Sequence, residues 1–434
     1  MLGELTVMLS GGTPSKSNPD YWHGTVPWAS AKDMKNYFLA DTEDHISDEA
    51  VQKATKLVPA GTVLLLTRGM TLLDDVPICL SMRPMTFNQD VKALRSKNGL
   101  LQEYLPYLLL GHKADLLDLV DLAGHGTGRL NSDELKNLPV LLPPESEQNK
   151  IAQFLGTVDN RLYNLSRQNE SIESIAQAIF KSWFVYFDPV RAKAEGREPD
   201  GMDAATAALF PDDFRDSLVD PLPIGWERMS LGEISQVGIG KTPPRAQSQW
   251  FSESDDDVVW VSIRDMGKSG VYIKSSSEFL TREAIDRFNV RLVPENTVII
   301  SFKLTVGRIA ITDGQLTTNE AIAHCVLPND ACISTEYLYC ALAAFDFTSL
   351  ASTSSIAEAV NSKTIRALSV TIPKKPLMNA YTSIAQPLFQ IMKNNQRTID
   401  TLSQLRDTLL PRLISGKLRV PEAEAMLTGG CREV

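Results

Sequence analysis

The chain carries two copies of one sequence pattern, and this internal repeat constrains its fold more than any other feature. Residues 2–5 read Leu-Gly-Glu-Leu and residues 231–234 read Leu-Gly-Glu-Ile. Residues 28–34 (Trp-Ala-Ser-Ala-Lys-Asp-Met) return in the same way as residues 260–266 (Trp-Val-Ser-Ile-Arg-Asp-Met). Matches this far apart indicate tandem domains, and a chain of 434 residues has room for two of them with connecting segments.

Within each copy the best-matched segments have the composition of buried strands. Residues 62–67 and 297–302 are mostly apolar, contain several β-branched side chains and follow a Pro and a turn residue. Short apolar runs bounded by such residues favour strands covered on both faces. We therefore expect an α+β fold, in which each copy forms a small α+β domain.

Two longer segments have apolar residues at alternate spacings of three and four, which is typical of a helix that buries one narrow stripe. The first extends over residues 151–183 and the second over residues 384–409, and an Asn occupies the same stripe position in both. A polar stripe residue costs stability but fixes the register of a helix pair. The stripe residues that we single out are Leu162, Leu165, Asn169, Ile179, Leu388, Ile391, Asn395 and Leu405.

The two helices can pair with each other in antiparallel orientation, because a long segment between them lets the chain reverse direction. Two other arrangements stay open at this point. Each helix could pack on its own domain, or the helices could pair with those of another protein.

The charge balance bears on the class of partner. The formal net charge is -10, which by itself disfavours nucleic acid. However, residues 188–220 hold nine acidic and four basic residues, so half of the excess negative charge lies in one short segment.

The five cysteines form no Cys-x-x-Cys pair, and no apolar run approaches the roughly 18 residues of a membrane helix. These features predict a cytoplasmic protein with reduced thiols and no membrane partner.

No motif predicts catalysis or metal binding. Gly240-Lys241-Thr242 resembles the end of a phosphate-binding loop, but Ser235 stands where that loop requires Gly, and Pro243 follows where a helix must begin. The five histidines are scattered, with no pair at helical ligand spacing. We therefore expect no catalytic residue and no metal site in this chain.

Several motifs together resemble one family, the specificity (S) subunits of type I restriction-modification systems. The similarity covers nearly the whole chain. The motifs are Leu-Pro-Pro-x-x-Glu-Gln-x-x-Ile-Ala at 142–152, Trp-Phe-Val-x-Phe-Asp-Pro-Val at 183–190, Pro-x-Gly-Trp at 223–226 and Leu-Leu-Pro-Arg-Leu-Ile-Ser-Gly at 409–416. The second long helix lacks the Glu147-Gln148 pair that opens the first, and this departure from the family pattern bears on the contact with a partner subunit at that end.

The resemblance implies a non-catalytic subunit that reads double-stranded DNA. Such subunits have two target-recognition domains, each reading one half of a split site, and two conserved helices that dock two DNA adenine methyltransferase (M) subunits. Restriction (R) translocase/nuclease subunits complete the system. S-adenosylmethionine, ATP and Mg²⁺ would belong to those partners, and this chain would hold no cofactor.

The expected organisation is a pseudo-two-fold repeat of two tandem recognition domains separated by two long antiparallel coiled-coil helices. The expected segments are a first recognition domain at 1–143, a first long helix at 144–187, an acidic linker at 188–225, a second recognition domain at 226–373, a second long helix at 374–420 and a tail at 421–434.

DNA reading requires polar and basic side chains on one face of each recognition domain, because phosphate contacts position a protein and base-edge contacts give specificity. The two domains differ outside the matched strands, so we expect an asymmetric site. An alternative is a coiled-coil interaction scaffold that does not bind DNA itself. The candidate DNA-binding residues are Lys16, Lys32, Arg68, Arg129, Lys241, Arg245, Arg264, Lys303 and Arg308.

Overall fold

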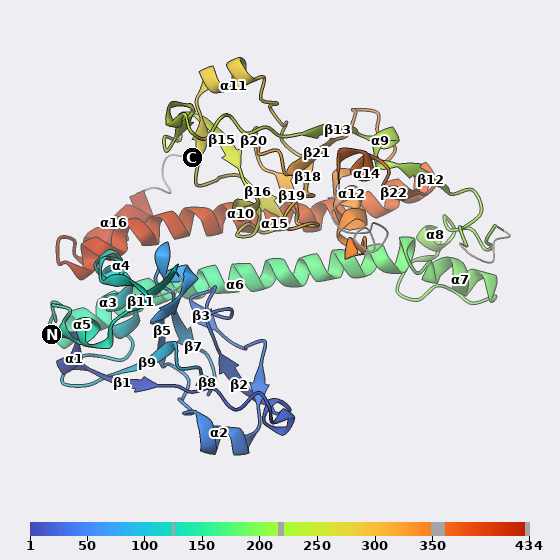
Figure 1. The fold of residues 1–434 in the computed structure, drawn as a ribbon. Helices are drawn as coiled ribbons and strands as arrows, with labels where there is room; N and C mark the ends of the chain where they lie inside the picture. Colours follow the sequence, from blue (N-terminus) through green and yellow to red (C-terminus); the bar gives the residue numbers. More distant parts are fainter. Residues whose placement is uncertain (124–125, 216–220, 349–360, 430–434) are drawn as a thin grey trace. The chain divides into compact units, whose positions relative to one another are not determined.

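The computed structural model describes residues 1–123, 126–215, 221–348 and 361–429 (Figure 1). It has an α+β fold, as the sequence predicted. The chain divides into two compact units, Met1–Asn164 with the described part of Asp400–Val434, and Leu165–Ile399. Each unit therefore contains one predicted recognition domain and part of each long helix. His125 and Cys431 lie outside the described residues.

The first unit is built on a five-stranded sheet. Its strand order is β1-β9-β5-β7-β3, and only the β3–β7 pair is parallel. The strands are β1 (Thr6–Ser10), β9 (Val91–Ser96), β5 (Val63–Leu66), β7 (Ile78–Ser81) and β3 (Phe38–Leu39). All four residues of β5 are buried, because strands cover both of its edges and core side chains cover both of its faces. The apolar run at 62–67 is thus the central strand of the sheet.

Two smaller sheets and several short helices complete the first unit. One small sheet has the order β4-β2-β8 and the other β10-β11-β6. Helix α2 begins where the Ser47 hydroxyl accepts a hydrogen bond from the Ala50 backbone N–H, as an N-cap residue does. The strands are β2 (Val26–Ala29), β4 (His45–Ile46), β6 (Arg68–Gly69), β8 (Thr86–Phe87), β10 (Val120–Ala123) and β11 (Thr127–Leu130), and the helices are α1 (Leu2–Leu5), α2 (Asp48–Ala54), α3 (Leu105–Gly111), α4 (Lys113–Asp118) and α5 (Ser132–Asn137).

The second unit repeats this architecture. Its main sheet has the order β13-β21-β18-β19-β16, again with one parallel pair, β16–β19. The main strands are β13 (Gln236–Ile239), β21 (Ile322–Val326), β18 (Val298–Ser301), β19 (Ile309–Thr312) and β16 (Tyr272–Ile273). The smaller strands are β12 (Glu227–Ser230), β14 (Phe251–Ser252), β15 (Val258–Val261), β17 (Phe279–Leu280), β20 (Thr317–Thr318) and β22 (Ser369–Ile372). The helices are α9 (Leu231–Ile234), α10 (Ile263–Met266), α11 (Arg282–Phe288), α12 (Thr335–Ala343) and α14 (Ser362–Arg366).

Matching hydrogen bonds show that the repeat extends to side chains. The indole N–H of Trp28 donates to the Gly12 carbonyl at 2.9 Å, and that of Trp260 donates to the Lys241 carbonyl at 3.2 Å. After each Trp, a Ser donates its N–H and hydroxyl to an Asp three residues later, at Ser30 and Ser262. The residues that best preserve the repeat in sequence therefore make the same local contacts in both domains.

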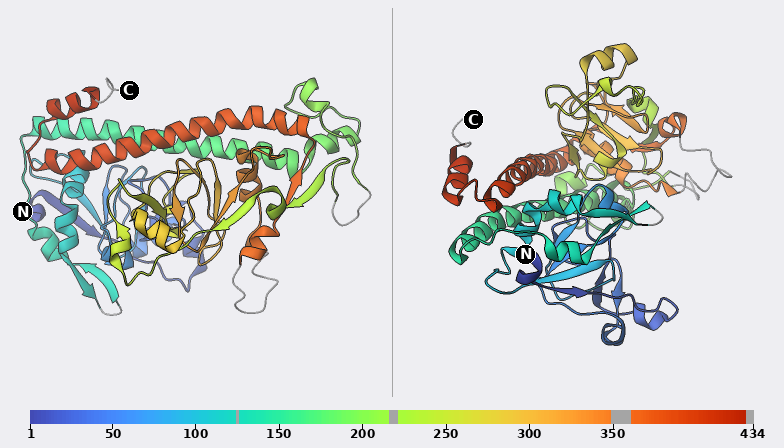
Figure 2. Two further views of the ribbon diagram at one scale, coloured as in Figure 1. Left: turned by 90° about the horizontal axis from the view of Figure 1, so that it is seen from above. Right: turned by 60° about the vertical axis from the view of Figure 1, so that its left-hand side comes forward.

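The two long helices are α6 (Glu145–Phe184) and α15 (Lys375–Ile414), each 40 residues long (Figures 1 and 2). In the second unit, Asn395 Nδ2 donates to Asn169 Oδ1 at 2.9 Å, while the Phe180 and Tyr381 rings lie 6.1 Å apart. The partner residue on α15 thus falls from 395 to 381 as the residue on α6 rises from 169 to 180. The pair is antiparallel, as the sequence predicted.

The buried stripe of α6 follows the expected positions. Leu162 and Leu165 are buried, and Asn169 and Ile179 are half-buried. On α15, Leu388, Asn395 and Leu405 are half-buried, but Ile391 is 42% exposed and Ile384 is 37% exposed.

At two positions of α15, the buried residue is therefore the one that directly follows the predicted stripe residue. Ala385 and Met392, which directly follow the two exposed isoleucines, are buried instead. The sequence offers two adjacent apolar residues at each of these points. The structure buries the smaller Ala and the flexible Met, which fills irregular gaps more easily than the β-branched Ile.

The segment expected to be an acidic linker is partly folded. It contains α7 (Asp188–Ala194) and α8 (Ala204–Ala207), and Val190, Phe210 and Leu222 belong to the core of the second unit. Lys193 Nζ donates to the Ala207 carbonyl at 3.3 Å, which ties the two short helices together. A last helix, α16 (Val420–Gly429), belongs to the first unit. Among the described helices, none combines the length and apolarity needed to cross a bilayer.

Candidate nucleic-acid interface

In the first unit, three loops meet beside the main sheet: the loop after β1, the turn after β5 and the turn between β8 and β9. The Gly12 N–H donates to the Phe87 carbonyl at 3.0 Å. The N–H and hydroxyl of Thr67 both donate to the Asp90 carbonyl, at 2.7 and 2.9 Å. These bonds fix the loops to one another, so side chains on them project from a rigid base.

An exposed polar pair stands where these loops meet. The Thr13 hydroxyl donates to Gln89 Oε1 at 2.5 Å. Arg68 directly follows Thr67, and it is the cross-strand partner of Arg129, which is also exposed. Directly opposed residues of two strands have Cβ atoms about 5 Å apart. Two guanidinium groups are thus concentrated at this edge of the first domain.

The second domain has the same loop framework. The Lys241 N–H donates to the Thr318 carbonyl at 2.9 Å, and the Phe302 N–H donates to the Ala321 carbonyl at 2.9 Å. The corresponding pair here is the half-buried Thr242 and the exposed Glu320, whose carboxylate accepts from the Thr242 hydroxyl. Thr242 corresponds to Thr13, and Glu320 corresponds to Gln89.

The environment of Glu320 favours its charged form. Partial burial acts to raise the pKa of this carboxyl group, but the hydrogen bond from Thr242 and the positive charges of Lys303 and Arg245 outweigh burial and lower the pKa. Lys303 directly follows Phe302 and therefore has the same place in the framework as Arg68. Each domain thus presents one Thr-held polar side chain next to a cation.

The structure gives the other basic candidates different surroundings. Lys32 forms ion pairs with Glu43 and Asp44, at 3.2 and 2.9 Å. Arg308 donates to the Ile263 carbonyl at 2.6 Å, and Lys241 donates to the Phe288 carbonyl at 2.5 Å. These three side chains therefore stabilise loops of their own domain.

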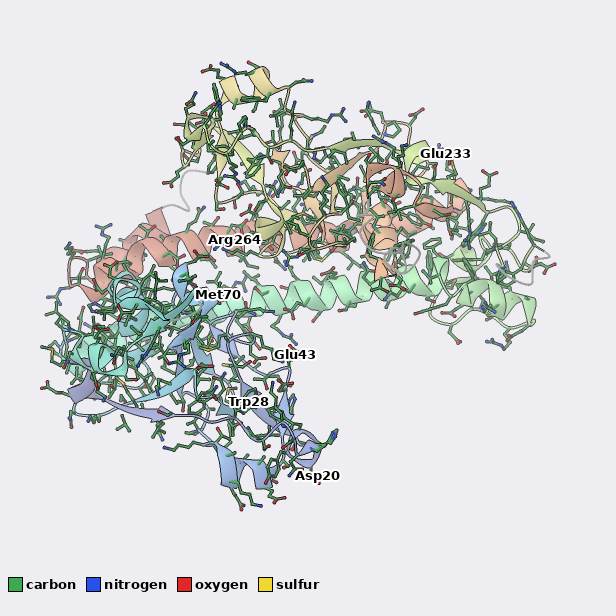
Figure 3. The ribbon with its side chains drawn as sticks, viewed as in Figure 1. Asp20, Trp28, Glu43, Met70, Glu233 and Arg264 are labelled. Atoms are coloured by element: carbon green, nitrogen blue, oxygen red, sulfur yellow. The ribbon has the colours of Figure 1, made fainter. Side chains whose placement is uncertain are left out.

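Three candidates remain to be placed. Arg245 forms a two-point ion pair with Glu278 at 2.5 and 2.9 Å, and its guanidinium lies over the rings of Phe251 and Trp260. Lys16 is exposed on the loop after β1. Arg264 is exposed on α10 (Figure 3).

Sequence reasoning found the cations at these loops but missed the polar pairs. Thr13 and Gln89 are 76 residues apart, so only folding reveals their contact. A signal was present, because Asn88-Gln89 and Asn319-Glu320 follow matching strands in the two copies. Asn88 and Asn319 each accept, through the side-chain oxygen, a hydrogen bond from the backbone N–H two residues later, at 3.0 and 3.1 Å. In each domain this turn orients its middle residue, Gln89 or Glu320.

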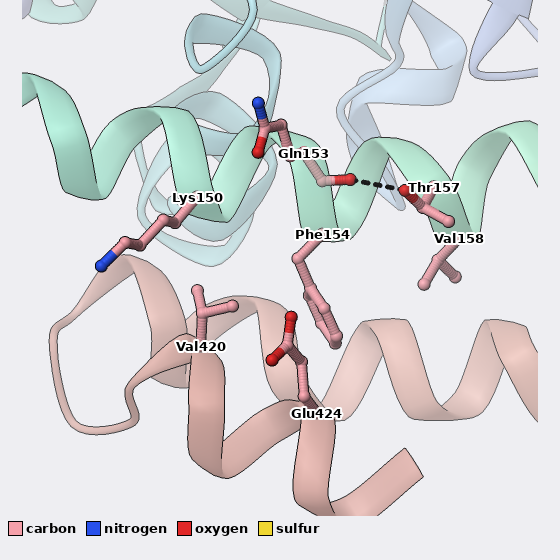
Figure 4. Close-up of a pocket in the computed structure, with 7 residues that line it drawn as sticks. All are labelled: Lys150, Gln153, Phe154, Thr157, Val158, Val420 and Glu424. Atoms are coloured by element: carbon pink, nitrogen blue, oxygen red, sulfur yellow. Dashed lines mark hydrogen bonds between the residues drawn. The ribbon is translucent and has the colours of Figure 1, made fainter. Parts of the chain in front are cut away.

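A groove of about 530 Å³ lies elsewhere in the first unit, where the start of α6 faces α16 (Figure 4). Phe154, Val158 and Val420 give it apolar walls. It has no cluster of metal-ligating side chains, and across all described residues no three His, Cys, Asp or Glu side chains are grouped to hold a metal ion. Lys150, Gln153, Thr157 and Glu424 also line the groove, so its walls are both apolar and polar.

The motif at the start of α6 acts within the chain. Gln148 is 1% exposed; its Oε1 accepts from the Leu101 N–H at 2.9 Å, and its Nε2 donates to the Gly99 and Pro143 carbonyls at 3.0 and 2.9 Å. All hydrogen bonds that the structure gives this side chain join α6 to the first recognition domain. The sequence comparison of the two helices suggested a subunit contact at this pair, whereas Gln148 is used internally.

Comparison with known proteins agrees with this architecture. The chain is 29% identical to the type I restriction enzyme MjaIX specificity subunit of Methanocaldococcus jannaschii, over 96% of this chain and 93% of that protein. It is 27% identical to the HindI specificity subunit of Haemophilus influenzae, over 74% of this chain and 78% of that protein.

The fold is also shared with a solved structure. The crystal structure of a type I restriction-modification S subunit from M. genitalium superposes with a TM-score of 0.54 at 15% identity, covering 95% of this chain and 94% of that one. The family profile described as type I restriction modification DNA specificity domain matches residues 1–174 and 223–409. The chain therefore belongs to the family of type I restriction-modification specificity subunits, the non-catalytic, DNA-specifying part of a multisubunit enzyme.

Proposed function

We propose that this chain reads an asymmetric, bipartite DNA site, with one half-site per recognition domain, and directs methyltransferase and restriction subunits to it. The methyltransferase subunits, two in number, bring S-adenosylmethionine, and the restriction subunits bring ATP and Mg²⁺. The assembly works in the cytoplasm, where the chromosome is accessible to it. The chain itself contributes recognition and no catalytic residue.

One observation carries this proposal: the loop framework is repeated, but the side chains it presents are not. The backbone hydrogen bonds of Thr67 and Phe302 match, as do those of Gly12 and Lys241. The exposed residues differ, with Gln89 in one domain and Glu320 in the other. A shared frame with different polar tips suits two modules that bind the same kind of partner with different sequence preference.

The candidate contacts divide into two roles. Arg68, Arg129 and Lys303 are exposed cations beside the loop junctions and would hold phosphate groups. Lys32, Arg308 and Lys241 contact their own domain and would keep the loops in place. Replacing Arg68 should thus weaken DNA binding at every sequence and reduce its dependence on salt by about one phosphate contact.

The proposal is tested by co-expressing the chain with its methyltransferase subunits and mapping methylated bases in genomic DNA. The expected result is one split motif with two different half-sites. A palindromic motif, or no dependence of methylation on this chain, contradicts the proposal.

A protein-interaction scaffold is the second candidate, and the net charge of -10 favours it. It predicts that the chain binds the methyltransferase subunits but leaves their DNA specificity unchanged. Exchanging the second recognition domain for that of a related subunit separates the two. A bipartite reader acquires one new half-site, whereas a scaffold shows no change.

A further inference from the structure

Each recognition domain presents one exposed side chain that is suited to contact a base edge, and it stands at the same point of the framework in both. Gln89 lies between Asn88 and Asp90 in a turn closed by the Asp90 N–H to Asn88 Oδ1 bond. Glu320 lies in the matching turn, closed by the Ala321 N–H to Asn319 Oδ1 bond. The two turns differ at their tip and at the residue after it, which is Asp90 in the first domain and Ala321 in the second.

That chemistry differs in a way that DNA can distinguish. A glutamine carries both an acceptor and a donor, and in the major groove it pairs with the N6 amino group and N7 of adenine. An ionised glutamate only accepts, and it pairs with the N4 amino group of cytosine. In the major groove, a carboxylate meets acceptors at guanine and thymine, and at adenine it meets the N7 acceptor beside the N6 amino group, so cytosine suits it best.

Both side chains are held before DNA arrives. The Thr13 hydroxyl bonds to Gln89 Oε1, and the Thr242 hydroxyl bonds to the Glu320 carboxylate. A side chain that is already oriented loses less conformational entropy on binding than a free one. Each tip oxygen that accepts from a Thr hydroxyl has a second lone pair for a base amino group. The Gln89 amide nitrogen also donates to Asp90 Oδ2 at 3.4 Å, and its second N–H is left for adenine N7.

The neighbouring cations place these tips next to a phosphate backbone. Arg68, the strand partner of Arg129, directly follows Thr67, whose N–H donates to the carbonyl of Asp90, the residue after Gln89. In the second domain, the charges of Lys303 and Arg245 act directly on Glu320. Phosphate contacts fix the register of a protein on DNA, so they would keep one tip residue facing one base pair.

We propose that Gln89 reads an adenine in one half-site and that Glu320 reads a cytosine in the other. The inference rests on the bipartite reading proposed above and adds which residue specifies one base in each half. Thr13 and Thr242 are positioning residues in this scheme, because they orient the tip without contacting the base.

The test exchanges the two tips in the complete assembly with its methyltransferase subunits. Q89E should lower the share of adenine at one position of one half-site by about tenfold or more, in favour of cytosine, and leave the other half-site unchanged. E320Q should do the reverse in the other half-site. T13V should relax the same position as Q89E, because its valine cannot hold the amide.

Matched controls make the same chemical changes away from the loops. Q52E on α2 and E283Q on α11 alter exposed residues of the same two domains, and both should leave the motif unchanged. A variant that co-purifies with its partners but methylates poorly is assayed by selecting bound duplexes from a randomised pool, where the same single-base change is expected.

The outcomes separate the two levels of the argument. If the unmodified assembly shows a bipartite motif and both tip exchanges leave every base preference intact, the assignment of Gln89 and Glu320 is wrong and bipartite reading stands. If the unmodified assembly has no bipartite motif, the proposed function itself is wrong.

Discussion

The two recognition domains share a fold but are joined to the long helices by different chemistry. In the first unit, neutral amide bonds from Gln148 join the domain to α6, and a buried ion pair between Asp159 of α6 and Arg406 of α15 joins the two helices to each other. In the second unit, the connection includes a partly exposed ion network, in which Arg397 and Lys393 of α15 both contact Asp313. The hydrogen bonds within the two domains thus match more closely than the side-chain contacts that join each domain to the long helices.

The difference has a physical origin in what each contact can tolerate. Backbone hydrogen bonds inside a sheet and between packed loops leave no freedom in position, because an unpaired buried N–H or carbonyl is costly. Side-chain contacts between a domain and a helix can be replaced by any pair of compatible chemistry. Duplicated domains are therefore expected to diverge first at attachments and at exposed tips.

The largest expected effect comes from breaking the buried ion pair that joins α6 and α15 in the first unit. R406M leaves Asp159, which is 2% exposed, without its cation, and it should cost about 3 kcal/mol of unfolding free energy. Burial raises the pKa of Asp159 even though Arg406 acts to lower it. Without Arg406, the buried Asp159 carboxyl group must take up a proton. Urea unfolding of the purified chain measures the change.

The corresponding change in the second unit is its control. R397M leaves Asp313 paired with Lys393, and Arg397 is half exposed, so the cost should stay below about 1 kcal/mol. Equal costs for R406M and R397M would show that the buried ion pair of the first unit and the partly exposed network of the second are energetically alike, contrary to this comparison.

An intermediate effect is expected where the two frameworks coincide. A Cβ atom at Gly11 would lie 2.1 Å from the Phe87 carbonyl oxygen, and one at Gly240 would lie 2.2 Å from the Asn319 carbonyl oxygen. Alanine at either position forces two loops apart, so G11A and G240A should each cost roughly 1 to 3 kcal/mol, by similar amounts. Thermal unfolding checks this.

G156A on α6 is the matched control. Its new Cβ would meet only the Tyr107 hydroxyl oxygen at 3.5 Å, an ordinary contact, and alanine favours a helix over glycine by about 1 kcal/mol. The control should be neutral or stabilising. If G11A destabilises and G240A does not, the two loop junctions are not structurally equivalent.

The same distinction explains what the sequence could predict. The strands at 62–67 and 297–302 were predictable because an apolar β-branched run between turn residues has few alternatives, and they became β5 and β18. Which residues of α15 form the buried stripe could not be predicted in the same way. Ile391 and Met392 are both apolar, and tertiary packing decides that Met392 is the buried one. The Thr13–Gln89 contact joins residues far apart in the chain, so only the closed sheet brings it about.

The smallest expected effect is a dependence of stability on pH that belongs to the second attachment alone. Burial of Asp313 acts to raise its pKa, but hydrogen bonds from Arg397 and Lys393 outweigh burial and lower the pKa below its ordinary value. A lowered folded-state pKa gives stability that is complete above the unfolded-state pKa, near 4, and is lost as pH falls through the folded-state value.

D313N removes the titrating group, so its stability deficit relative to the unmodified chain, below about 1 kcal/mol at pH 7, should shrink as the pH falls from about 5 to 3. D255N, which changes an exposed carboxylate of the same unit, should show no such convergence. A D313N deficit that stays constant over this range would mean that the ion network does not stabilise the second attachment through the charge of Asp313.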